Sequence, residues 1–264
     1  MKERFRKLLD FGRWAMLPLT AVFLLAFAGK AGMEFQVREL KITVDNASTG
    51  LYFMTERDVR DLLNSKAIIV EGTLASQIDV ARIEELFRND PYVKNAEAYL
   101  SIDGVLNIDV SQRIPLLRVF TMGGKSFYLD ADGNKMPVSD QFTARVITAS
   151  GFLGEEVSPG EAHPNLTDSL LLLAKAIMEN DFMSAQTEQI FVNEEKEFEI
   201  CPKVGRHIIR MGSATDLEEK FSKLILFYRK AMVSSRWEEY RILDLRFRDQ
   251  VVCSRNPINP HTLR

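Results

Sequence analysis

Between residues 89 and 115 the chain contains two stretches in which apolar and polar side chains alternate with a period of two. Such alternation is typical of strands that have one buried face. A two-residue turn at Asp103-Gly104 would mix the two faces, whereas a three-residue loop over 102–104 keeps both apolar sets on one side. Gly104 then takes the left-handed position that this loop requires. The pattern therefore predicts a β-hairpin that pairs Leu100 with Leu106, Ala98 with Ile108 and Ala96 with Val110.

The residues before the hairpin predict one strand and two helices. Residues 35–44 alternate loosely and are interpreted as a strand. Thr55 opens a capping-box-like Thr-Glu-Arg-Asp, followed by apolar residues at helical spacing. Asp79 can cap a second helix, which ends at Asp90-Pro91 because a residue before proline is pushed out of the helical region. The order strand, helix, helix, strand, strand predicts a small α+β domain with both helices on one face of a three-stranded sheet.

After Pro115 the pattern changes to short β-like runs separated by turns and interrupted by two helices. The predicted strands lie at residues 116–122, 126–129, 145–149, 189–192, 197–201, 207–211, 242–247 and 251–253. One predicted helix covers 166–180, with Leu170, Leu173, Ala174 and Ile177 in phase. The other opens with a capping box from Thr215 to Glu218. The fold class is therefore predicted to be α+β, with a β-rich second domain that begins near residue 113.

The N-terminal segment has the pattern of a membrane-targeting sequence. Residues 14–29 carry no charge, and the first 33 residues hold six basic side chains against two acidic ones. This predicts a membrane-spanning helix over 14–33 with residues 1–13 in the cytoplasm. A cleaved signal peptide is the alternative, because Ala26-Phe27-Ala28 resembles a cleavage site. Both interpretations place the bulk of the chain outside the cytoplasm.

The remaining sequence offers no catalytic or metal-binding constellation. The three histidines are isolated, without the spacing of a metal site, and His207 in a strand-like run is interpreted as structural. Residues 130–134 resemble the start of a calcium loop but lack the downstream glutamate, so a hairpin turn is preferred. Cys201 and Cys253 are either two free thiols or one bridge. The net charge of −3, without a basic stripe, disfavours nucleic acid. We expect a binding or scaffold protein with no cofactor.

The arrangement as a whole resembles the bacterial cell-division family FtsQ/DivIB. The most specific segments are 90–96 (DPYVKNA) with the hairpin after it, 128–137 (YLDADGNKMP), 203–212 and 244–247 (DLRF). The resemblance implies a cytoplasmic tail over 1–13, a transmembrane helix over 14–33, a POTRA domain over 34–112, a β domain over 113–255 and a flexible tail over 256–264. The chain departs from the family at Gln112-Arg113, where Glu-Arg is frequent, and at Asp45-Asn46, where a glycine is frequent. An inserted-looking segment, 47–54, follows.

The resemblance also implies a function. A member of this family is a non-enzymatic, single-pass protein of the cytoplasmic (inner) membrane with its C-terminal domains outside the cytoplasm. It recruits FtsB- and FtsL-like single-span partners (DivIC-like proteins) to the septum and helps to control septal peptidoglycan synthesis. A POTRA-containing assembly or transport factor for outer-membrane proteins is the alternative. Against this, the sequence has one POTRA-like unit and no run of barrel strands.

The resemblance places partner binding close to the C-terminus. The predicted partner-binding residues are Asp244, Leu245, Arg246, Phe247 and Val251. The POTRA hairpin and the last strand of the β domain are candidate edges for strand addition, in which main-chain hydrogen bonds supply affinity. The alternative for Phe247 is that it packs in the core.

Overall fold

The structure is a computed structural model that describes residues 35–153, 164–231 and 239–255. The chain divides into two compact units. The first comprises Met1–Gly50 and Met54–Gln112, and the second comprises Leu51–Phe53 and Arg113–Arg264, each as far as it is described. The predicted cytoplasmic tail, transmembrane helix and C-terminal tail (1–13, 14–33 and 256–264) lie outside the described residues. Within the described ranges, no helix has the length and apolar character that a membrane span requires.

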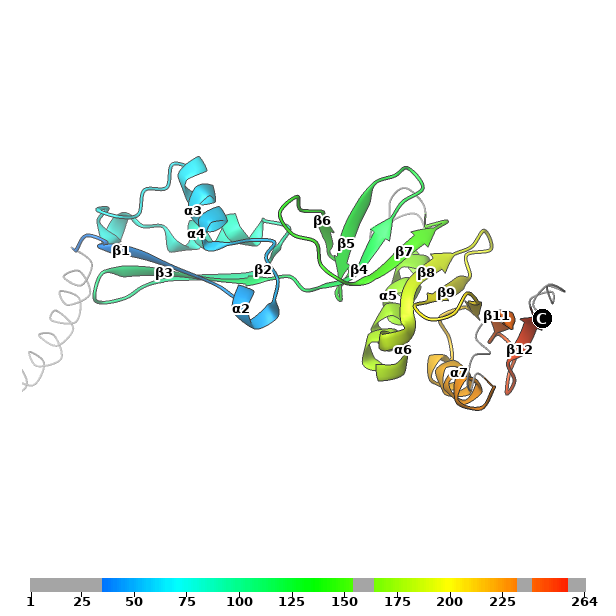
Figure 1. The fold of residues 1–264 in the computed structure, drawn as a ribbon. Coiled ribbons are helices and arrows are strands. Elements are labelled where there is room, and N and C mark those ends of the chain that lie inside the picture. The colour runs from blue at the N-terminus through cyan, green and yellow to red at the C-terminus, as the bar shows by residue number, and fades with distance from the viewer. Residues whose placement is uncertain (1–34, 154–163, 232–238, 256–264) are drawn as a thin grey trace, which may run out of the picture. The chain divides into compact units, whose positions relative to one another are not determined.

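The first unit is a three-stranded sheet with two main helices on one face (Figure 1). Its elements are β1 (Glu39–Val44), α2 (Asn46–Thr49), α3 (Glu56–Ser65), the 3₁₀ turn η1 (Ala75–Gln77), α4 (Val80–Arg88), β2 (Val93–Leu100) and β3 (Val105–Gln112). The strand order is β1-β3-β2, with β1 parallel and β2 antiparallel to the central β3. The predicted order of strands and main helices is confirmed, while the one-turn helix α2 was not predicted.

The hairpin of β2 and β3 has the predicted register. Leu100 pairs with Leu106, Ala98 with Ile108 and Ala96 with Val110. The loop is closed by the Ser101 N–H, which donates to the Val105 carbonyl at 2.9 Å, and Gly104 has a φ of 86°. That left-handed conformation strains any residue with a Cβ, so the glycine fixes the loop length and hence the register.

Both helices of the first unit begin at the predicted caps. Thr55 and Asp58 form a reciprocal capping box, and the Asp79 carboxylate accepts the Arg82 N–H at 3.0 Å. The helices direct their apolar stripes at the sheet. Buried residues on them are Val59, Leu63, Ile83 and Phe87, which join the inner face of the strands in one core cluster. Capping and periodicity thus both favour the same helix boundaries.

The two departures from the family pattern contact each other in the first unit. Gln112 is buried, and its side-chain oxygen accepts the Met54 N–H at 2.9 Å. Its amide nitrogen lies 3.3 Å from Asp45 Oδ1, and the Asp45 carboxylate also accepts the Gln112 N–H. A glutamate at position 112 would place a second carboxylate beside Asp45. The amide avoids that repulsion and supplies a donor, so the two departures are matched to each other.

The second unit is built on a nine-stranded sheet of order β12-β11-β10-β9-β8-β7-β4-β5-β6 (Figure 1). The strands are β4 (Pro115–Phe120), β5 (Ser126–Asp130), β6 (Lys135–Pro137), β7 (Ile147–Gly151), β8 (Thr187–Val192), β9 (Phe198–Pro202), β10 (Ile208–Gly212), β11 (Tyr240–Asp244) and β12 (Val252–Arg255). The helices are α5 (Pro164–Glu179), α6 (Asp181–Gln186) and α7 (Leu217–Ala231). The four in-phase residues predicted for α5 are completely buried, in a core that also contains one face of α7.

Several boundaries in the second unit differ from the predictions. The predicted strand 242–247 ends at Asp244, so Leu245 to Phe247 belong to a connection rather than to β11. Helix α7 begins at Leu217, one residue later than a cap at Thr215 requires, and the Thr215 hydroxyl lies 2.8 Å from that of Ser213. The short elements α6 and β6 were not predicted. Each is too short to show a clear period in the sequence.

The predicted turn at 130–134 connects β5 and β6 as an antiparallel hairpin, and the prediction is confirmed. One oxygen of Asp130 accepts the N–H groups of Asp132 and Asn134 at 2.9 and 2.8 Å, and the other pairs with Arg113 Nη1 at 3.0 Å. Burial raises the pKa of Asp130, but the hydrogen bonds, chiefly those from Asn134, outweigh it and lower that pKa overall. The carboxylate is thus occupied by the turn itself.

Candidate partner-binding edge

Strand β12 forms one end of the nine-stranded sheet. It pairs antiparallel with β11, and within the described residues no strand pairs with its other side. An edge strand presents a row of N–H and C=O groups that can pair with another chain. β12 is also little buried, and Val252 at its start is 42% exposed. It therefore provides both backbone groups and apolar surface.

The five predicted partner-binding residues occupy two different environments. Asp244 and Leu245 are buried, and Leu245 is completely inaccessible as part of the core. Its N–H donates to the Arg210 carbonyl at 2.9 Å, which continues the pairing between β10 and β11 by one residue. Phe247 is 45% exposed, so it is not a core residue, while Arg246 is exposed and Val251 is half-buried. Direct contact with a partner is thus open to Arg246, Phe247 and Val251.

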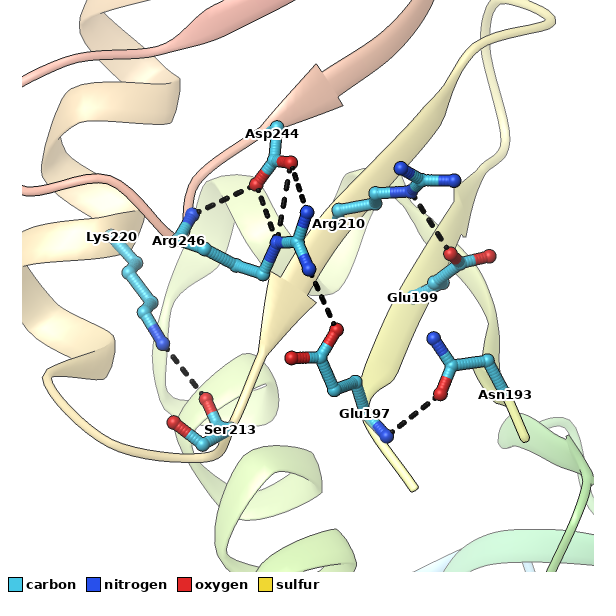
Figure 2. Close-up of polar contacts among 8 residues, drawn as sticks. All are labelled: Asn193, Glu197, Glu199, Arg210, Ser213, Lys220, Asp244 and Arg246. Atoms are coloured by element: carbon cyan, nitrogen blue, oxygen red, sulfur yellow. Dashed lines mark hydrogen bonds and ion pairs between the residues drawn. The ribbon is translucent and has the colours of Figure 1, made fainter. Parts of the chain in front are cut away.

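Arg246 links three segments around the connection between β11 and β12 (Figure 2). Its Nη2 lies 2.7 Å from Asp244 Oδ2, and its Nε donates to Asp244 Oδ1 at 3.0 Å. Its Nη1 lies 3.0 Å from Oε2 of Glu197, the residue immediately before β9. The Asp244 carboxylate also accepts the Arg246 backbone N–H at 3.1 Å. This two-pronged pairing of a guanidinium with a carboxylate fixes orientation as well as distance.

The charges in this contact reinforce each other. Burial raises the pKa of Asp244, but the hydrogen bonds from Arg246 outweigh it, and the pKa lies below its usual value. The hydrogen bond to Asp244 in turn raises the pKa of Arg246. Both pKa shifts thus favour the ionised forms of the side chains that this contact requires.

Gly212, the last residue of β10, makes room for the stem of Arg246. A Cβ at this position would lie 2.7 Å from Arg246 Cγ, closer than real Cβ contacts. The φ of Gly212 is +69°, which also strains residues other than glycine. Glycine is thus needed here for two reasons, and one of them is the position of Arg246.

Helix α7 holds the same connection from another side. Lys223 Nζ donates to the Phe247 carbonyl at 2.6 Å and also lies 3.6 Å from Glu219. The neighbouring Lys220 is buried and donates to the Ser213 carbonyl at 2.8 Å, which ties the helix to the segment after β10 (Figure 2). Phe247 therefore lies on a connection that is held by Glu197 before β9, by β11 and by α7. A backbone segment held in this way loses little conformational entropy on binding.

Strand β2, the candidate edge of the first unit, is occupied differently. Glu84 of α4 accepts the Ala98 N–H at 3.0 Å and pairs with Arg88 Nη2 at 2.7 Å. The same Arg88 nitrogen lies 3.5 Å from the Ala96 carbonyl. Two outward groups of this edge are thus bonded to a helix of the same unit, which is one way in which proteins protect sheet edges.

His207 and the cysteines contribute packing rather than reactivity. His207 is buried, its Nε2 lies 2.6 Å from the Tyr228 hydroxyl, and burial lowers the pKa of His207 to about 4. Cys201 and Cys253 are free thiols, each half-buried, and burial raises the pKa of both. Raised thiol pKa values disfavour the reactive thiolate. In the part of the chain that the structure describes, no group of His, Cys, Asp or Glu side chains is arranged to hold a metal ion.

Three residues of this site were not predicted to contact the connection between β11 and β12. Glu197, Gly212 and Lys223 come from separate elements and meet the connection only in the folded unit. The short motif Asp-Leu-Arg-Phe did indicate the region, because it resembles a family segment. The arrangement is that of a two-unit α+β protein in which, among the described residues, the edge strand β12 lies beside an exposed aromatic residue.

Comparison with known proteins identifies the family. Residues 36–111 match a POTRA-like domain, and residues 114–254 match the family described as FtsQ/DivIB, C-terminal related. The chain belongs to the FtsQ/DivIB family. Cell division protein FtsQ of Rhodothermus marinus is 27% identical over 258 residues, which cover 95% of this chain and 89% of that protein. Cell division protein FtsQ of Salinibacter ruber is 26% identical over 255 residues, which cover 94% and 96%.

Proposed function

We propose that this protein acts in bacterial cell division as a non-enzymatic scaffold. Residues 14–33 hold it in the cytoplasmic membrane, with 1–13 inside, and the POTRA domain (34–112) and β domain (113–255) lie outside the cytoplasm. It recruits FtsB- and FtsL-like single-span proteins to the septum and so helps to control septal peptidoglycan synthesis. The observation that carries the proposal is the open β12 edge beside the exposed Phe247. The names of the two relatives support the cellular role.

In this proposal an extended segment of the FtsB-like partner adds to β12 as a further strand. Main-chain hydrogen bonds supply affinity, and side chains on either side of the new strand supply specificity. Phe247 inserts into an apolar recess of the partner, and the half-buried Val251 extends that contact. Asp244 and Leu245 act indirectly. Both are buried and hold the connection in position, so they do not touch the partner.

The test is a substitution at the exposed aromatic residue. Phe247→Glu places a charge where the proposal requires an apolar contact, and aromatic residues of this kind often contribute 2 kcal/mol or more to binding. We expect roughly a 30-fold weaker interaction, the equivalent of about 2 kcal/mol, when crosslinked membranes are solubilised and the FtsB-like partner is co-purified. The melting midpoint of the exported part should stay nearly unchanged, because Phe247 is 45% exposed.

Phe120→Glu is the matched control. Phe120 is also a half-exposed phenylalanine, 40% accessible, but it lies on β4, far from β12 in the strand order. It should leave partner recovery as in the wild type. Undiminished recovery with Phe247→Glu would refute the β12 proposal. Equal loss with both variants would indicate an effect on folding instead of binding.

Depletion of the protein tests the cellular role independently of the edge. Filamentous cells with blocked septa are expected for a division scaffold. Normal division combined with missing outer-membrane barrels would instead support an envelope assembly factor and refute the proposal.

A further inference from the structure

The first unit gathers three segments at the end where its described chain begins. The Arg38 N–H donates to the Gly104 carbonyl at 2.8 Å, so the start of β1 adjoins the β2–β3 turn. The Ala75 N–H donates to the Phe35 carbonyl at 2.9 Å, and Leu74 forms an isolated bridge with Gln36, so the start of η1 and the residue before it lie at the same end. Figure 1 shows the start of β1 and the β2–β3 turn at the same end of the unit. These contacts tie the turn firmly to residue 35.

Phe35 follows the predicted membrane span, 14–33, with one residue between them. Because each residue extends the chain by at most about 3.6 Å, Phe35 lies within about 7 Å of the end of that span. The β2–β3 turn is in contact with Phe35, because a Cβ on Gly104 would lie 3.6 Å from Phe35 Cδ2. If the span crosses the membrane, the β2–β3 turn is therefore at the lipid surface.

Two exposed apolar side chains lie at this end, beside the exposed Asp103 of the turn. Ile102, at the tip of the turn, is 99% exposed, and Leu74 in the adjoining segment is 38% exposed. A single exposed apolar residue on a protein surface needs no special explanation. Two exposed apolar residues at the end of the unit that follows a predicted membrane span are in a position where lipid would cover them. Arg38, also exposed at this end, suits the phosphate groups of lipids.

We propose that the tip of the β2–β3 turn, Ile102 with Leu74 beside it, is a membrane-contact site that rests in the lipid headgroup region. The proposal rests on the membrane anchoring given under the proposed function. The POTRA unit is then attached to the membrane at two points, the chain itself and the turn. The second point restricts how the unit can tilt about the first.

Spin labels on the full-length chain in lipid nanodiscs of phosphatidylethanolamine and phosphatidylglycerol test this site. The label is placed at Asp103→Cys, so that Ile102 is retained, in a background in which Cys201 and Cys253 are serine. Asn89→Cys is the control, because it is exposed and lies at the opposite end of β2. At about 3.3 Å per residue, the eight residues of β2 separate the two ends by roughly 26 Å.

We expect the label at 103 to be several-fold more accessible to oxygen, relative to a water-soluble nickel complex, than the label at 89. Adding Ile102→Glu should return the label at 103 to the value of the control, while Ile102→Leu should not. The side chain is fully exposed, so neither change disturbs packing. A label at 103 that is as water-accessible as that at 89, in a protein that remains in the nanodisc, would refute the contact site alone. A chain that does not associate with the nanodisc would refute the membrane anchoring as well.

Discussion

Each of the two sheets has two edge strands, and the two candidate edges for a partner, β2 and β12, differ in what contacts them. On β2, helix α4 supplies Glu84 to the Ala98 N–H and Arg88 toward the Ala96 carbonyl. On β12, no such contact from a neighbouring element is present among the described residues. Instead, the contacts around Asp244 and Arg246 hold the connection that precedes β12. The β2 edge is thus covered by side chains of α4. The β12 edge is not covered by any described element, but the connection that precedes it is held in place.

For the proposed function, this difference favours β12 over β2 as the strand that a partner would pair with. A partner strand on β2 would first have to displace a charged pair that already bonds the backbone. A partner strand on β12 meets backbone groups with which no described strand pairs, and an exposed phenylalanine nearby. On the sequence, both the POTRA hairpin and the last strand were candidate edges, and in the structure β2 and β12 are each terminal in their sheet. The side chains that separate them come from a helix in one case and from three elements in the other.

The largest expected effect concerns the support beneath β12. Leu245→Ala removes a completely buried side chain from the core, and such changes lower the free energy of unfolding by about 2–5 kcal/mol. Phe247→Ala, two residues further on, should lower it by less than about 1 kcal/mol, as exposed positions do. The measurement is urea unfolding, monitored by hydrogen exchange in peptides from residues 240–255. These peptides report the stability of the second unit without a contribution from the first.

The two variants together distinguish a residue that stabilises the β12 edge from a residue that contacts the partner. Leu245→Ala should weaken partner recovery only as far as it unfolds the edge, so stabilising osmolytes should restore recovery. They should not restore recovery for Phe247→Ala. If Leu245→Ala leaves the unfolding of residues 240–255 unchanged, Leu245 does not stabilise the connection that precedes β12.

A smaller effect is expected at the position that accommodates Arg246. Gly212→Ala combines a left-handed φ with a Cβ only 2.7 Å from Arg246 Cγ, whereas Gly124→Ala has a similar φ of 78° and nothing within 4 Å. Gly124→Ala should therefore cost about 1–2 kcal/mol, the conformational cost alone. Gly212→Ala should cost clearly more, and should speed hydrogen exchange in residues 246–252. Equal losses in urea unfolding would mean that Arg246 moves aside freely and does not fix the connection.

What the sequence predicted well was decided by neighbouring residues. The hairpin register followed from Gly104 and two apolar faces, and the starts of α3 and α4 followed from Thr55 and Asp79. These signals operate within a few residues, where turn and cap geometry leave few alternatives. The four buried positions of α5 likewise followed from helical spacing.

What the sequence did not predict depends on residues far apart in the chain. The parallel pairing of β10 with β11 joins segments that are separated by helix α7. The division of Asp244–Phe247 into buried and exposed residues arises because the chain leaves β11 at Asp244, which alternation alone did not reveal. The role of Gly212 depends on a side chain 34 positions later, and no local pattern contains that information.

The smallest expected effect lies on the covered edge. Glu84→Ala removes the acceptor of the Ala98 N–H, and exchange of that amide should accelerate by up to roughly tenfold, the usual limit for one such bond. Glu85→Ala is the control, since Glu85 is the exposed neighbour on the same helix. Equal exchange rates in the two variants would mean that Glu84 does not cover the edge.

In the wild-type protein, acidification should also break the hydrogen bond between Glu84 and the Ala98 N–H. The hydrogen bond from Ala98, followed by that from Arg88, lowers the pKa of Glu84 in the folded state below its usual 4.5. Because the folded pKa is the lower one, the contribution is complete above pH 4.5 and disappears as the pH falls through the folded pKa. The nuclear magnetic resonance signal of the Ala98 amide should thus titrate with a midpoint below 4.5. A midpoint at or above that value would show that the carboxylate is not bonded to β2, and the two edges would then differ less than their geometry indicates.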